Sequence, residues 1–497
     1  MEYEPAIGLE IHTELKTKTK MFCYSLNDPN EQHPNVNICP ICMGHPGTLP
    51  TINQEAVKKT IKAGLALNGN IQELSEFDRK SYFYPDLPKG YQISQYHHPL
   101  VVGGFLDLPH YRIPNRRIRI RRIHLEEDTG RLIHEKADGA TLVDFNRAGV
   151  PLMELVTEPD LRSGEEVKQF GEELQKILRY IGASDADMEK GQMRVEVNIS
   201  LQPTTNNQQP TTNELGTKVE IKNINSFKFA ADAAEHEIKR QSAILERGEK
   251  IEQETRGWDE RKQQTFSQRS KEEAHDYRYM PEPDLPPLRL SPAFIEQLAA
   301  ELPELPAAKR ERFVREYELE YESAEILTRE KSFGEFFDAV ASELKRRDRD
   351  TPDVPSKHLA RSAAALATGD FLRLINDASA SAQDTRITPE NFAELIVLFA
   401  ENRISNLAAK EVLLEMFRSG EDPSDIVEQR GLWQMSDTAN LEDIVSHIIK
   451  ENPKAAADYK NGKAASLQFL VGQVMKETRG KANPKVVQEI LQKILTP

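Results

Sequence analysis

Acidic residues and a histidine occur close together at two points in the first 160 residues. His124 is followed by Glu126, Glu127 and Asp128, and residues 143–160 alternate apolar with ionisable residues before glycine and proline interrupt the pattern. Carboxylate oxygens are ligands that Mg²⁺ prefers in proteins, where this ion usually lies beside a phosphate. The two segments therefore predict the floor of an active site that holds a hard cation.

Three further segments carry polar residues at every second position, which is typical of a strand with one buried face. Their polar positions are Glu10, His12 and Glu14 in residues 7–15, Arg194, Glu196 and Asn198 in residues 194–200, and Lys218, Glu220 and Lys222 in residues 218–222. If these faces meet, four glutamates and one histidine converge as ligands for Mg²⁺, namely Glu10, His12, Glu126, Glu127 and Glu196. The alternative for each glutamate is an exposed strand charge paired with a nearby arginine.

Residues 117–121 begin a fourth strand of this kind. The alternation of apolar residues changes phase at Arg121-Arg122-Ile123. Because a shift of one residue turns every following side chain to the other face, we expect a bulge or a strand end before Glu126.

Two basic residues could bind phosphate oxygens, Lys80 and Arg194, and the fork of an arginine suits that role. Lys80 lies in the aromatic and proline-rich segment 78–92, which could equally be a rigid packed loop. Neither the P-loop nor the dinucleotide-binding glycine motif occurs in the sequence, so ATP would have to be held in another way.

The chain has three cysteines, Cys23, Cys39 and Cys42. The spacing of Cys39 and Cys42 is that of a zinc knuckle, which needs a fourth ligand, and His33 and His45 are candidates. The alternative is three buried, inert thiols.

Length and charge restrict the class of protein. A chain of 497 residues predicts two or three domains. Its formal net charge of −15 argues against a surface that binds nucleic acid everywhere, because phosphates need clustered Lys and Arg. No apolar run approaches the roughly 20 residues that span a bilayer, and the first residues lack the features of a signal peptide. We expect a cytoplasmic protein with no membrane partner.

The half-polar strands predict an antiparallel sheet that helices cover on one side. Residues 165–181 carry apolar residues at helical spacing and predict one such helix. The proline-rich segment 281–287 ends this part, and the apolar spacing beyond it is helical. The fold class is therefore α+β, with a sheet domain at 1–290, an all-α linker domain at 291–350 and an all-α tail domain at 351–497.

Six segments together resemble the B-subunit family of the tRNA-dependent Asp/Glu-tRNA amidotransferases (GatB family). Their order and spacing cover nearly the whole chain, which makes the set much more specific than any single motif. The segments are Gly8–His12, Asp78–Gln95, His124–Gly130, Asp144–Asp160, Gly191–Asn198 and Lys218–Phe227.

The resemblance implies a reaction and a fold. Members of this family use ATP and Mg²⁺ to phosphorylate the side-chain carboxylate of Asp-tRNA(Asn), Glu-tRNA(Gln) or both, and ammonia then displaces the phosphate. The ammonia comes from glutamine through an amidase, the A subunit of the complex, and a small C subunit tethers the heterotrimer. The first domain would be a glutamine-synthetase-like cradle and the tail a YqeY-like domain that touches the misacylated tRNA.

The resemblance also implies a role for each matching residue. The metal would be bound by Glu10, His12, Glu126 and Glu127, with Glu196 where the family usually has aspartate. The phosphates would be surrounded by Lys80, Arg147, Glu154 and Arg194. The path of ammonia would be lined by Lys89 and Asp276. The acceptor end of tRNA would lie near Lys218, Lys222, Asn223 and Asn225. Zinc-bearing relatives have a fourth cysteine where this chain has Ser25.

Two other functions compete with this one. A tRNA-binding scaffold that has lost catalysis would use the charged face as a structural ion-pair network. A ligase that joins a small carboxylic acid to an amine fits less well with the basic helical tail. ATP hydrolysis that depends on misacylated tRNA would separate catalysis from the scaffold.

Overall fold

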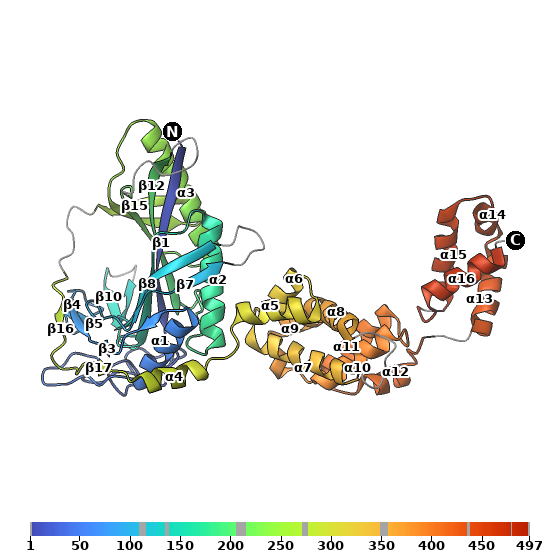
Figure 1. The fold of residues 1–497 in the computed structure, drawn as a ribbon, viewed down its shortest axis with the longest axis horizontal. Helices are drawn as coiled ribbons and strands as arrows, with labels where there is room; N and C mark the ends of the chain where they lie inside the picture. Colours follow the sequence, from blue (N-terminus) through green and yellow to red (C-terminus); the bar gives the residue numbers. More distant parts are fainter. Residues whose placement is uncertain are drawn as a thin grey trace. The chain divides into compact units, whose positions relative to one another are not determined.

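The computed structural model describes residues 2–108, 116–134, 139–204, 215–270, 277–347, 356–434, 438–478 and 480–495. Two compact units follow one another along the chain, Met1–Pro306 and Ala307–Pro497. The first unit contains the strands and the second is helical (Figure 1).

A ten-stranded sheet forms the centre of the first unit. Nine of its strands follow the order β15-β14-β13-β12-β1-β11-β8-β6-β2, and β7 pairs with β8 beside this path. The strands are β1 (Glu2–Glu14), β2 (Asn70–Ile71), β6 (Val101–Val102), β7 (Phe105–Leu108), β8 (Arg116–Glu127), β11 (Pro151–Thr157), β12 (Met193–Thr204), β13 (Val219–Lys222), β14 (Glu254–Asp259) and β15 (Gln264–Ser270).

The sheet is mixed, where the sequence predicted an antiparallel one. Its pairs are antiparallel except for β13 with β14, which run parallel because the helix α3 (Phe227–Glu246) carries the chain back between them. The bulge expected in β8 is present: Val156 lies opposite Arg122 while Thr157 lies opposite Ile120, so Arg121 is the extra residue. β8 then continues to Glu127 without ending.

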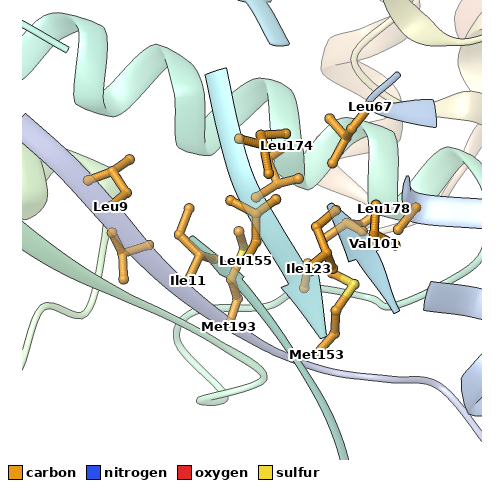
Figure 2. Close-up of a cluster of buried hydrophobic side chains, with 14 of the residues drawn as sticks. Leu9, Ile11, Leu67, Val101, Ile123, Met153, Leu155, Leu174, Leu178 and Met193 are labelled. Carbon is orange, nitrogen blue, oxygen red and sulfur yellow. The ribbon is translucent and has the colours of Figure 1, made fainter. Parts of the chain in front are cut away.

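Helices cover the apolar face of the sheet, as predicted. They are α1 (Gln54–Ala66), α2 (Gly164–Tyr180) and α3, and α2 matches the expected helix within a residue at each end. Figure 2 shows Leu9 and Ile11 of β1, Ile123 of β8 and Leu155 of β11 on the side where Leu174 and Leu178 of α2 lie. These side chains are fully or almost fully buried, so the opposite face is left for the polar residues.

Short strands form three small sheets beside the large one. The order β16-β4-β5 makes a three-stranded sheet, and β10 pairs with β9 and β17 with β3. The bounds are β3 (Leu74–Ser75), β4 (Asp78–Ser81), β5 (Tyr91–Ser94), β9 (Arg131–His134), β10 (Thr141–Asp144), β16 (Met280–Pro281) and β17 (Leu288–Arg289), and α4 (Pro292–Ala300) follows β17.

In the described part of the second unit, the regular elements are helices. The first group is α5 (Pro306–Tyr317), α6 (Tyr321–Leu327), α7 (Lys331–Arg347), α8 (Ser356–Leu366), a π-helical turn (Ala367–Phe371), α9 (Leu372–Asp377), a 3₁₀ turn (Ala382–Asp384), α10 (Pro389–Ala400), α11 (Asn406–Ser419) and α12 (Pro423–Arg430). The second is α13 (Thr438–Glu451), α14 (Pro453–Lys460), α15 (Ala464–Glu477) and α16 (Pro484–Leu495).

Two apolar cores stabilise these helices, one over residues 313–427 and one over residues 441–495. The first core includes Phe337 of α7 and Phe392 of α10, which lie on the two sides of the boundary expected at residue 350. The division into linker and tail domains, and the likeness of the cradle to glutamine synthetase, stay predictions.

Candidate active site on the polar face of the sheet

Four neighbouring strands place their polar residues in rows on one face of the large sheet. His12 of β1 lies opposite Arg194 of β12 on one side and Glu154 of β11 on the other, and Glu154 lies opposite His124 of β8. In the next row, Glu10 lies opposite Glu196. Residues far apart in the sequence thus meet through strand register.

Glu154 and His12 form the centre of this group. The Nε2 atom of His12 is 3.3 Å from Glu154 Oε2, 3.5 Å from Glu126 Oε1 and 3.8 Å from Glu10 Oε1. The Nε2 atom of His124 is 3.5 Å from Glu154 Oε2. Two sets therefore have ligand atoms close enough to share a metal ion, namely Glu10 with His12 and Glu154, and His124 with Glu126 and Glu154.

Burial and neighbouring charges shift the pKa values of this group. Burial raises the pKa of Glu126, and burial with the charge of Glu154 raises that of Glu10 to about 7. Burial alone would lower the pKa of His12, but its hydrogen bond with Glu154 raises it to about 9. Burial lowers the pKa of His124 to about 4. In the absence of metal, protons therefore offset the charge of crowded carboxylates at neutral pH.

This donor set fits a divalent cation. Three carboxylates supply the oxygens that Mg²⁺ prefers. His124 is a neutral imidazole, and its buried Nδ1 atom has no hydrogen-bond partner among the described residues. A bound cation would replace the protons that otherwise reduce the repulsion among Glu10, Glu126 and Glu154.

Glu127 points away from this group. Ile123, Leu125 and Glu127 alternate along β8 on the apolar side, whereas His124 and Glu126 face the polar side. Glu127 Oε1 accepts a hydrogen bond of 3.0 Å from the backbone N–H of Ile93 and pairs with the Lys89 ammonium. The structure thus joins Glu127 with Lys89 and not with the other expected metal ligands.

A cavity of about 210 Å³ adjoins the Lys89–Glu127 pair. Cys42, His45 and Tyr91 contribute to its wall together with that pair. Asp276, expected with Lys89 on the path of ammonia, lies outside the described residues.

Basic residues border the acidic group. Arg194 Nη2 is 2.9 Å from Asp128 Oδ2, and Arg147 Nε is 3.6 Å from the same oxygen. Burial lowers the pKa of the Lys80 ammonium of β4, but the charges of Glu126 and Glu154 outweigh this effect and raise it. Lys80 and Arg194 thus both feel the charge of Glu126, and Arg147 joins Arg194 at Asp128.

Of the four positions expected to contact tRNA, Lys222 lies next to Glu196. The Lys222 ammonium is 2.8 Å from Glu196 Oε2 and 3.7 Å from Glu220 Oε1, so it neutralises the strand carboxylates. Lys218 and Asn223 are exposed. Asn225 is also exposed and donates a hydrogen bond of 2.9 Å to Glu260.

The three cysteines come together as the knuckle spacing predicted. Their Sγ atoms lie within 4.8 Å of one another, and Ser25 Oγ is 3.9 Å from Cys42 Sγ. Lys20, fully buried, places its Nζ 3.7 Å from the same sulfur. Hydrogen bonding from Cys23, helped by the Lys20 charge, lowers the pKa of the Cys42 thiol to about 4. His33 instead pairs with Glu31.

Three residues of the site were noted in the sequence but were not proposed there as metal ligands or phosphate contacts. His124 completes the second ligand set, and Arg122 lies 3.7 Å from Glu154 Oε1 through its Nη2 atom. Both share strand parity with Glu126, which is the signal that identifies them. The closeness of Glu14 to Asp128, which with burial raises the pKa of Glu14 to about 8, depends on long-range register and leaves no local signal.

Comparison with known proteins places the chain in one family. A family model described as the GatB/GatE catalytic domain matches residues 5–296, and one described as the GatB domain matches residues 354–495. Relatives named as the B subunit of an aspartyl/glutamyl-tRNA(Asn/Gln) amidotransferase are similar over the full chain. The protein of Thermotoga petrophila is 46% identical over 500 residues, with 100% of this chain and 99% of the relative covered.

Two further relatives with the same name extend this result. The proteins of Caldanaerobacter subterraneus subsp. tengcongensis and Persephonella marina are each 47% identical, and 100% of both chains is covered in each comparison. Among the described residues, no helix is long and apolar enough to cross a membrane. Domain matches and full-length identity agree, and the chain belongs to the family of aspartyl/glutamyl-tRNA(Asn/Gln) amidotransferase B subunits.

Proposed function

We propose that the polar face of the sheet catalyses ATP-dependent amidation of Asp-tRNA(Asn), Glu-tRNA(Gln) or both in the cytoplasm. The observation that carries this proposal is the closely spaced group of Glu10, His12, Glu126 and Glu154, in which Glu126 and Glu154 are buried, with basic residues beside it. A carboxylate is a poor acceptor for ammonia until one of its oxygens becomes part of a leaving group. The site offers charge neutralisation and positioning, which phosphoryl transfer requires more than a protein nucleophile.

The reaction has two steps. A side-chain carboxylate oxygen of the aminoacyl-tRNA attacks the γ-phosphorus of ATP, and ADP leaves. The nitrogen of ammonia then attacks the carbonyl carbon of this acyl phosphate, and inorganic phosphate leaves with the former carboxylate oxygen. Both steps begin from crowded negative charge, so the site must neutralise it.

In this proposal Mg²⁺ would be held by Glu10, His12, Glu126, Glu154 and His124. A cation at this place would neutralise phosphate charge. Lys80 faces this group from β4 and would bind phosphate oxygens. Arg194 and Arg147, which Asp128 orients, would do so as well. Glu196 would act on the metal only through its neighbour Glu10, because Lys222 holds its carboxylate.

We place the path of ammonia on the other side of β8. Lys89 and Glu127 form a buried ion pair at the wall of a cavity, and both can hydrogen-bond to a small polar molecule. Separation from bulk water would keep ammonia from becoming protonated before it attacks. This assigns Glu127 to the ammonia path together with Lys89 and Asp276.

Partners follow from the reaction. Ammonia requires a glutaminase, which we propose is an amidase, the A subunit, with a small tethering C subunit in a heterotrimer. The acceptor end of tRNA would lie near Lys218, Lys222, Asn223 and Asn225, and the helices after residue 351 would contact its body. Zinc would bind Cys23, Cys39 and Cys42, whose lowered Cys42 pKa supplies a thiolate.

The test is reconstitution. The chain is co-purified with the candidate amidase and the candidate tether, and ATP-dependent conversion of Asp-tRNA(Asn) and Glu-tRNA(Gln) to their amides is measured. Conversion supports the proposal and gives the substrate range. An assembled complex that binds tRNA without forming amide or hydrolysing ATP would instead favour a scaffold that has lost catalysis.

A further inference from the structure

A stack of planar side chains borders the acidic group on the side of the three-stranded sheet. The rings of Tyr96 and Tyr279 lie face to face, with centroids 4.2 Å apart and an angle of 14° between their planes. The guanidinium of Arg122 lies 5.5 Å from the centroid of Tyr96. Three planar groups from separate segments therefore meet at one place.

Hydrogen bonds to buried side chains hold the segment that carries Tyr96 in place. The buried carboxylate of Asp78 accepts hydrogen bonds of 2.8 Å and 3.0 Å from the backbone N–H groups of Tyr96 and His97, and its other oxygen is 2.9 Å from His97 Nδ1. Gln95, fully buried, accepts a bond of 3.0 Å from the Leu125 N–H of β8. This support fixes Tyr96 relative to the strand that carries Glu126.

Tyr96 nevertheless exposes 46% of its surface, and the His97 side chain exposes 51%. Burial of a large ring is the usual outcome in a folded domain. A half-exposed tyrosine that is anchored in this way can take part in stacking at little cost in conformational entropy. Stacking of a nucleic-acid base on aromatic rings and arginine planes is a recognition mode that such a surface supports.

The stack lies within a short reach of the acidic group. Arg122 links the two, because its guanidinium contacts both the Tyr96 ring and Glu154, the latter at 3.7 Å. The Lys80 ammonium lies 4.9 Å from the centroid of the Tyr277 ring, and that ring neighbours Tyr279, with centroids 6.1 Å apart. An adenine base on the stack would therefore have its ribose near the carboxylates.

We propose that Tyr96, Tyr279 and Arg122 bind the adenine of the 3′-terminal nucleotide of the aminoacyl-tRNA. This inference rests on the proposed function, in which the reacting carboxylate is joined through its amino acid to the terminal ribose. The base is attached to that same ribose, so it must lie no farther from the acidic group than the length of one nucleoside. The stack lies beside the acidic group, to which Arg122 connects it. The adenine of ATP is the competing occupant, and it differs in lying a triphosphate away from the reacting phosphorus.

The test uses tRNA with 2-aminopurine in place of the terminal adenine, misacylated and added to the complex of this chain with its partner proteins. Stacking on aromatic rings quenches 2-aminopurine fluorescence. Tyr96→Phe keeps a flat ring and should keep the quenching, whereas Tyr96→Ala should lose it and raise KM for misacylated tRNA about 10- to 100-fold. Phe83→Ala removes an aromatic side chain that is 85% exposed outside the stack, and should change neither value.

A parallel measurement identifies the occupant. Binding of ADP with Mg²⁺ is measured by calorimetry for the wild-type, Tyr96→Phe and Tyr96→Ala complexes, and the three dissociation constants should agree. A Tyr96→Ala complex that binds ADP more weakly but still quenches 2-aminopurine would overturn the proposal in favour of the adenine of ATP. Unchanged quenching and KM, or no quenching by the wild type, would also overturn it.

The same experiment separates this inference from the function on which it rests. A wild-type complex that forms no amide contradicts the proposed function. A wild-type complex that forms amide, while Tyr96→Ala behaves like Tyr96→Phe, contradicts only the assignment of the stack.

Discussion

Glu126 and Glu127 are neighbours in β8 and face opposite sides of the sheet. Glu126 approaches His12 on the polar face, at 3.5 Å, whereas Glu127 pairs with Lys89 beside a cavity. In the regular part of a strand, adjacent residues point to opposite faces. The two carboxylates therefore serve different steps in the proposed reaction, Glu126 the activation of the substrate and Glu127 the delivery of ammonia.

Added ammonia should distinguish these two steps. We expect Glu127→Gln to lower glutamine-dependent amide formation about tenfold or more, because loss of the ion pair leaves the Lys89 ammonium buried without its partner. Ammonium chloride at alkaline pH should restore the activity of this variant. Glu126→Gln should stay inactive with ammonium chloride, since its substrate is not activated. Equal rescue of both variants, or of neither, would contradict the separation.

Glu154 should be the most sensitive position of the acidic group. Glu154→Gln keeps the size of the side chain but removes a charge that both ligand sets share. Because metal stabilises developing charge by several kcal/mol, we expect amide formation to fall roughly 100-fold or more. Glu158→Gln is the matched control, since its carboxylate pairs with exposed Arg121 and should leave the rate unchanged. Steady-state rates with saturating tRNA measure both, and a normal rate for Glu154→Gln would refute this role.

Mg²⁺ binding should release protons. The pKa of Glu10 is raised to about 7 and that of His12 to about 9, so at neutral pH in the metal-free protein His12 carries a proton and Glu10 carries one in about half of the molecules. Ligands must lose these protons to bind metal, so Mg²⁺ affinity should rise as the pH increases from about 6 to about 9. Calorimetry in two buffers of different ionisation enthalpy counts the protons released. Affinity that is constant over this range would exclude His12 and Glu10 as ligands.

Local patterns predicted much of this site, and their limits are physical. The alternation of Ile7, Leu9 and Ile11 with Glu10 and His12 correctly gave the two faces of β1, since burial of one face demands that period. The same rule, applied after the bulge at Arg121, places Ile123, Leu125 and Glu127 on one side. Grouping Glu127 with Glu126 by closeness in sequence neglected that alternation.

The register between strands that are far apart in the sequence could not be predicted from the sequence. Nothing near Glu154 shows that it will lie between His12 and His124, because two separate pairings of β11 decide this. The parallel pairing of β14 with β13 likewise depends on where α3 returns the chain. The Tyr96–Tyr279 stack joins residues from distant parts of the first unit's sequence and has no local pattern.

The close approach of α2 and α3 should make Gly164 intolerant of a side chain. A Cβ atom there would lie 2.4 Å from the carbonyl oxygen of Ala231, which is backbone and cannot swing aside. We expect Gly164→Ala to lower the free energy of unfolding by about 1–3 kcal/mol. Gly472→Ala, in α15 with no atom within 4 Å of the new Cβ, should instead be neutral or slightly stabilising. Urea unfolding compares both variants with the wild type, and a neutral Gly164→Ala would contradict the packing.

Zinc content tests the cysteine group. We expect the purified complex to hold one zinc ion per chain, bound by Cys23, Cys39 and Cys42, and to lose it in Cys42→Ser. Ser25→Cys supplies a fourth thiolate next to Cys42 and should slow the removal of zinc by a chelator. Elemental analysis by mass spectrometry gives the stoichiometry. A wild type without zinc, with a Ser25→Cys variant that also lacks it, would identify the group as buried thiols.

Transfer of a carboxylate oxygen to phosphate tests the central claim most directly. The wild-type complex is given ATP, glutamine and tRNA misacylated with aspartate or glutamate in which both side-chain carboxylate oxygens are ¹⁸O. If the polar face activates the carboxylate as an acyl phosphate, mass spectrometry should find one ¹⁸O in the inorganic phosphate for each amide formed. Amide formation that leaves the phosphate unlabelled would contradict the proposed mechanism.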